Sequence, residues 1–130
     1  MMSGEPLALH ASPPGLDPDA LARLTALDPK GENKLLERVL RAFQTSAARL
    51  MPQLEAARLS GDRATVRLVA HTLKSSSASI GALELSQVCG QVEALIRAES
   101  ADDLEPLLHT MRSTLDAALV AIQHLLDGAR

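Results

Sequence analysis

Apolar residues recur at helical spacing along four long segments, and this pattern limits the chain to helical folds. The segments are residues 32–59, 62–79, 82–98 and 102–126. In the first of them the apolar positions are Leu36, Leu40, Phe43, Ala47, Leu50 and Leu54. A period of 3.6 residues places such side chains on one face of a helix. Because no segment alternates apolar and polar residues as a half-buried strand does, the sequence predicts an all-α protein.

The composition agrees with closely packed helices. Hydrophobic residues make up 46% of the 130 residues, yet Phe43 is the only aromatic residue. The core must therefore consist of Leu, Ala, Val and Ile, which suit packed helices better than sheets. Four long helices with short connections predict an antiparallel up-down four-helix bundle.

A short extra helix is expected before the bundle, at about residues 17–27. Asp17 is a plausible N-cap, with Pro18 at the first helical position. The residues before it are rich in proline and glycine. We therefore divide the chain into a flexible leader at residues 1–15 and a single helical bundle domain at residues 16–130.

The connections carry their own signals. Residues 60–62, with the sequence Ser-Gly-Asp, interrupt the apolar pattern and can cap the helix that follows. Gly81 is expected to end the helix at 62–79. Pro106 should lie in or near the first turn of the last helix, where proline is least costly. Pro52 falls inside a helix, where it should bend the helix or loosen one turn.

Several classes of protein are disfavoured. The formal net charge is −3, and no surface combines aromatic and basic residues, which argues against nucleic-acid binding. No apolar run is long enough to span a membrane, and the N-terminus lacks the cationic and apolar segments of a secretory signal, so we expect a cytoplasmic protein. Cys89 is the only cysteine and is expected in the core. The remaining histidines are too scattered for a metal site; they are His10, His109 and His124.

The helix at 62–79 presents a histidine on its polar side. On a helical wheel the apolar residues lie within about 40° of the direction opposite His71; they are Val66, Val69, Leu73 and Ile80. Arg67 and Lys74 lie one turn to either side of His71. A neutral imidazole is a nucleophile, and neighbouring cations favour an anionic electrophile such as a phosphoryl group.

The segment 70–93 resembles the histidine-containing phosphotransfer (HPt) domains of multistep two-component signalling. The matching residues are His71, Leu73, Lys74, Ser76, Ser77, Gly81, Ala82, Leu85, Cys89 and Glu93. The helix pattern extends the resemblance to about residues 17–127. The resemblance implies a phosphocarrier that accepts a phosphoryl group on His71 from an aspartyl phosphate of a receiver domain and passes it to another receiver.

The resemblance also implies the partners. They would be hybrid sensor kinases and response regulators, whose receiver domains supply the aspartate and Mg²⁺, so we expect no cofactor or metal on this chain. Such domains have no kinase activity of their own and are mostly monomeric. The absence of a Gly-rich phosphate loop in the sequence agrees with this.

Two further site roles follow from the family pattern. Lys74 would stabilise the incoming phosphoryl group. Glu93 would hydrogen-bond the inner ring nitrogen and leave Nε2 free to attack, and Gln91 is a weaker candidate for that contact. Ser76 and Ser77 are expected to let the two helices approach closely, as packing residues.

Partner docking is expected around His71, on residues that share its side of the helix. They are Ala64, Arg67, Leu68, Ser75 and Ala78. Ser75 departs from the family, which commonly has glycine there. Its hydroxyl could narrow receiver access or supply a hydrogen bond, and the sequence leaves both open.

Two other functions compete with the phosphocarrier. The first is a docking or sequestering module that keeps the bundle but transfers no phosphoryl group, and only Ser75 favours it. The second is a phosphohistidine phosphatase or other hydrolase. A hydrolase is disfavoured because the sequence has no catalytic set of nucleophile, general base and general acid beside His71. It also has no metal cluster there.

Overall fold

The computed structural model describes residues 15–128, which form five helices and no strand. The predicted leader, apart from Gly15, lies outside these residues. The helices are α1 (Pro18–Ala26), α2 (Leu35–Ser60), α3 (Arg63–Ser79), α4 (Leu83–Arg97) and α5 (Glu105–Gly128). The predicted all-α bundle with a short extra helix at its start is confirmed.

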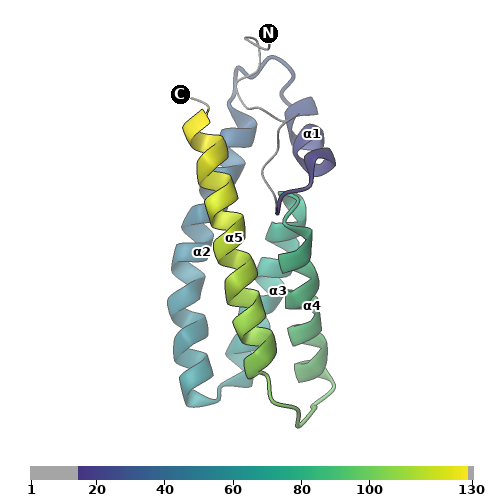
Figure 1. The fold of residues 1–130 in the computed structure, drawn as a ribbon, viewed down its shortest axis with the longest axis vertical. Helices are drawn as coiled ribbons and strands as arrows, with labels where there is room; N and C mark the ends of the chain where they lie inside the picture. The colour runs from purple at the N-terminus through teal and green to yellow at the C-terminus, as the bar shows by residue number, and fades with distance from the viewer. Residues whose placement is uncertain (1–14, 129–130) are drawn as a thin grey trace.

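The four long helices run antiparallel, and α1 lies at one end of the bundle (Figure 1). Each long helix packs on the next in the sequence, and α5 closes the bundle by contacting α2. The α3–α4 pair shares the most extensive contact. These two helices follow one another after only three residues, which makes them adjacent antiparallel neighbours.

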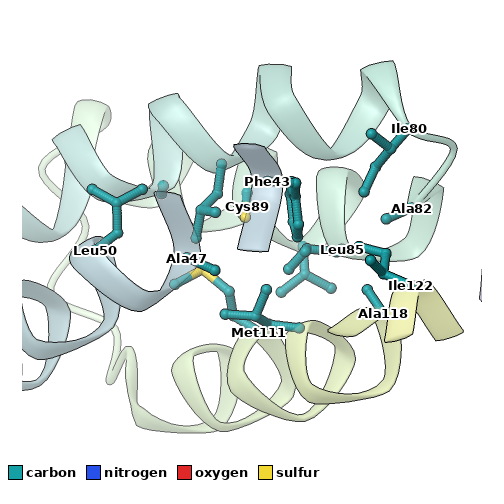
Figure 2. Close-up of a cluster of buried hydrophobic side chains, with 14 of the residues drawn as sticks. Phe43, Ala47, Leu50, Ile80, Ala82, Leu85, Cys89, Met111, Ala118 and Ile122 are labelled. Carbon is teal, nitrogen blue, oxygen red and sulfur yellow. The ribbon is translucent and has the colours of Figure 1, made fainter. Parts of the chain in front are cut away.

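The core lies along the axis of the bundle and is almost entirely aliphatic. Figure 2 shows Phe43 of α2 among residues of the other long helices, including Leu85 and Ile122. Cys89 lies in this cluster and is fully buried, as predicted for a core residue. Burial raises the pKa of its thiol to about 12. The thiol therefore stays protonated and unreactive at physiological pH.

Two helices begin three residues later than predicted. The start of α2 is Leu35 instead of residue 32, because the buried Asp28 carboxylate accepts the N–H groups of Asn33 and Leu35, at 3.2 and 3.1 Å. Those donors would otherwise lack partners at a helix start. The start of α5 is Glu105, whose N–H donates to Asp103 Oδ1 at 3.0 Å. In both places a preceding aspartate caps the helix through its side chain.

The other helix-end predictions have mixed outcomes. Asp62 caps α3 as predicted, by accepting the Thr65 N–H at 3.1 Å. Asp17 occupies the N-cap position of α1, with Pro18 in the first turn, as predicted, although the Asp17 side chain makes no capping hydrogen bond. Pro52 lies on the exposed side of α2, which continues as one helix to Ser60.

Gly81 joins α1 to the α3–α4 turn. Its φ of +82° is a conformation that favours glycine, and its carbonyl oxygen accepts the Asp17 N–H at 2.8 Å. A Cβ at this position would lie 2.8 Å from Asp17 N and 2.9 Å from Asp17 O. The glycine therefore both ends α3 and lets the start of α1 approach the turn.

Replacing Gly81 tests this close approach. Gly81→Ala should lower the free energy of unfolding by about 3 kcal/mol, because the left-handed backbone and the clash with Asp17 both oppose a side chain. Gly61→Ala is the matched control, since its φ is +73° but no atom lies within 4 Å of the added Cβ. It should cost about 1 kcal/mol. Urea unfolding measures both, and equal losses would contradict the role assigned to the α1 contact.

Candidate functional site

The contact between α3 and α4 brings His71 and Glu93 together. His71 Nδ1 lies 2.6 Å from Glu93 Oε2. Lys74, one turn after His71 on α3, donates from Nζ to Glu93 Oε1 at 2.5 Å. Arg97, one turn after Glu93 on α4, donates from Nη2 to Oε2 at 2.9 Å. The structure thus gathers the three predicted residues, His71, Lys74 and Glu93, in one cluster with an arginine.

The Glu93 carboxylate is buried, whereas the groups around it reach solvent. Glu93 is 1% exposed, and the side chains of His71 and Lys74 are 57% and 38% exposed. The hydrogen bond from Lys74 is the largest cause of a lowered Glu93 pKa, which falls to about 2 although burial acts in the opposite direction. The hydrogen bond from His71 lowers it further. Glu93 is therefore ionised at neutral pH.

An ionised Glu93 determines the tautomer of His71. A carboxylate can only accept hydrogen bonds, so Nδ1 of His71 must carry the proton that lies between the two groups. A neutral ring with its proton on Nδ1 has its free lone pair on Nε2. The buried carboxylate thus orients the exposed imidazole and leaves the outer nitrogen able to act as a nucleophile or proton acceptor.

Small residues allow α3 and α4 to lie this close. Ser77 is fully buried and donates its hydroxyl hydrogen to the Leu73 carbonyl, which agrees with the predicted packing role. Ser76 is only partly buried, and its hydroxyl donates to the Thr72 carbonyl at 3.1 Å. Across the contact, Ser86 of α4 donates to the Lys74 carbonyl at 2.8 Å. This last bond ties the backbone at Lys74 directly to α4.

The predicted docking residues lie on the same side of α3 as His71. The exposed ones are Ala64, Leu68, Ser75 and Ala78. Leu68 is one of the few large apolar side chains on the surface. Arg67 is half-buried. Gln91 is exposed on α4, and Glu93 makes the contact to the ring for which Gln91 was the weaker candidate.

Arg97 is the residue of this cluster that the sequence analysis missed. Its spacing of four from Glu93 was visible and is typical of an ion pair on one helix. An ion pair of that kind on the surface of a helix does not indicate a functional site, however. Only the burial of Glu93 makes the arginine part of the site.

The described part of the chain contains neither a metal cluster nor a membrane-spanning helix. Nowhere in 15–128 do three or more histidine, cysteine, aspartate or glutamate side chains gather in a way that could hold a metal ion. None of the helices in this range has the length and apolar character needed to cross a membrane.

Comparison with known proteins identifies the family. The model of the Hpt domain family matches residues 38–127, so the chain belongs to this family. No curated protein sequence matches it. Among solved structures it is similar to the crystal structure of histidine-containing phosphotransfer protein B (HptB) from Pseudomonas aeruginosa PAO1. The two share 24% identity, with a TM-score of 0.76 over 87% of this chain and 95% of HptB. This likeness shows that the fold is the same.

The buried carboxylate predicts a dependence of stability on acid pH. The folded-state pKa of Glu93, about 2, lies below its ordinary value of 4.5. Its ionisation therefore stabilises the fold above about pH 4.5, and that stabilisation is lost as the pH falls toward 2. The difference in unfolding free energy between wild type and Glu93→Gln should shrink over this interval.

Urea unfolding followed by circular dichroism at several pH values measures this difference. Glu84→Gln, on the exposed first turn of α4, controls for the loss of one negative charge. A wild-type to E93Q difference that stays constant from pH 5 to pH 2 would show that Glu93 is not held in its ionised form by the fold.

Proposed function

We propose that this Hpt domain carries a phosphoryl group on Nε2 of His71. It accepts the group from an aspartyl phosphate of one receiver domain and passes it to the aspartate of another. The observation that carries the proposal is the exposed imidazole whose Nδ1 is held by a buried, ionised carboxylate. The likeness to HptB, a histidine-containing phosphotransfer protein, supports the same function.

The proposed transfer step makes use of this geometry. The Nε2 lone pair attacks phosphorus, the N–P bond forms, and the bond from phosphorus to the aspartyl oxygen breaks, which leaves the aspartate as a free carboxylate. The proton on Nδ1 stays beside Glu93, so the ring becomes more positive without losing its orientation. Transfer to the next receiver is the reverse of this step. Catalysis is thus positioning and charge stabilisation.

Lys74 supplies positive charge at the phosphoryl group. It lies one turn from His71, and its ammonium group already reaches the carboxylate beside the ring. An ammonium group has three donors, so it can bind phosphoryl oxygens as they arrive. We propose that the receiver brings Mg²⁺ and the aspartate, while this chain binds no metal or cofactor.

We further propose that the chain is a cytoplasmic, monomeric phosphocarrier without ATP-dependent kinase activity. Its partners would be receiver domains of hybrid sensor kinases and response regulators. Docking would use the exposed face around His71, with Leu68 and Ala78 at its apolar part. The alternative is a docking module with no transfer, and Ser75 favours it because it is exposed beside His71 where the family commonly has glycine.

Phosphoryl transfer to His71 is tested with radiolabelled receiver domains from the host. The wild-type chain should acquire an acid-labile label, and His71→Gln should acquire none because its amide has no nucleophilic nitrogen. Ser75→Gly shows whether the serine limits transfer. Retained receiver binding by the wild type without any label would favour the docking module.

A bulky side chain beside His71 should block the receiver without unfolding the bundle. Ala78→Phe is expected to slow transfer by about tenfold, because the ring would hold the receiver away from the imidazole. Ala78 is exposed, so the thermal midpoint should stay close to that of the wild type. Ala117→Phe, on the exposed side of α5, is the control and should transfer normally. An unchanged rate for A78F would remove Ala78 from the interface.

A further inference from the structure

Arg97 binds the same carboxylate oxygen as the imidazole, and the proposed transfer assigns it no role. Its Nη2 lies 2.9 Å from Glu93 Oε2, and His71 Nδ1 lies 2.6 Å from that oxygen. Lys74 takes the other oxygen, Oε1. Two cations from different helices therefore share one buried carboxylate, Lys74 from α3 and Arg97 from α4.

During transfer Lys74 has two negative partners. It binds Glu93 at rest, and the phosphoryl group on His71 would attract the same ammonium. As the ammonium group turns toward the phosphoryl group, its hydrogen bond to Glu93 Oε1 weakens. Water cannot readily replace it, because Glu93 is 1% exposed. A buried carboxylate that loses its donors tends to take up a proton or to move toward solvent.

Arg97 can hold the carboxylate through this step, because the proposed transfer gives its guanidinium group no other partner. It reaches Glu93 from the same helix, four residues on, so its contact does not depend on the position of Lys74. The other ionisable group near the carboxylate on α4 is the Cys89 thiol, which is buried and protonated. Among the described residues, Arg97 is thus the cation that stays bound to Glu93 while Lys74 binds the phosphoryl group.

We propose that Arg97 is a positioning residue, which keeps Glu93 ionised and aligned on Nδ1 of His71 while Lys74 serves the phosphoryl group. The role of Arg97 during transfer rests on the proposed function. The contact itself exists in the unphosphorylated chain, where it can be tested alone. The simpler view is that Arg97 forms an ordinary exposed ion pair that only stabilises α4, since its side chain is 64% exposed.

The tautomer of His71 distinguishes these two roles. Nitrogen-15 NMR of the full chain at a pH of about 9, above the ordinary titration range of histidine, reports which ring nitrogen carries the proton. The wild type and Lys74→Met should both show mainly the Nδ1–H form, because Arg97 still holds Glu93. In the double variant K74M/R97M the fraction in the Nε2–H form should rise about threefold. Lys74→Met with Arg97→Lys should restore most of the Nδ1–H form.

Arg112→Met is the matched control. Arg112 of α5 is 57% exposed and pairs with Glu55 of α2 at 3.2 Å, so neither residue belongs to the α3–α4 pair that carries His71 and Glu93. It should leave the tautomer unchanged in the wild-type and K74M backgrounds. Identical tautomer ratios in K74M and K74M/R97M would overturn the positioning role, and far-UV circular dichroism verifies that each variant is folded.

Transfer kinetics provide the second measurement. Arg97→Met alone should slow phosphoryl transfer from a labelled receiver about threefold, because Lys74 is then the only cation left for two anions. Arg112→Met should transfer at the wild-type rate. A normal rate for R97M would contradict the role during transfer. A shifted tautomer in K74M/R97M, with no label on any variant or on the wild type, would support the contact between Arg97 and Glu93 and refute the proposed function.

Discussion

The site depends on one buried charge, the carboxylate of Glu93. A carboxylate in the interface between two helices is costly unless donors surround it. Here the imidazole, the ammonium and the guanidinium groups all bind it, at distances from 2.5 to 2.9 Å. The same contacts hold His71 in one tautomer. The same interaction therefore stabilises the buried charge of Glu93 and orients His71 as a nucleophile.

The rest of the bundle serves to bring α3 and α4 together at this point. Ser77 of α3 is fully buried, and the side chain of Ser86 on α4 donates a hydrogen bond to the α3 backbone at Lys74. At the end of the pair, Gly81 accepts a hydrogen bond from the start of α1. The aliphatic core, with Cys89 protonated inside it, provides a rigid support but no chemistry of its own. The reactive groups are confined to one exposed face.

Much of the fold was predictable because helical periodicity is a local property. The apolar spacing located all four long helices, and Asp17-Pro18 located the short one. The start of α2 was predicted three residues too early because a side chain there acts over several residues. Asp28 caps α2 across a turn, which delays the start of that helix to Leu35. Short-range capping rules do not describe such a contact.

The sequence by itself determined the helical class, the face on which His71 lies and the spacing typical of the family, because these follow from residue order along single helices. The family resemblance also pointed to Glu93 as the partner of the imidazole, without showing whether its carboxylate was buried. Only the tertiary structure decided that, since burial depends on how α3 packs on α4. Arg97 belongs to the site for the same reason. Its spacing from Glu93 is local, but its importance comes from the burial of the carboxylate that it binds.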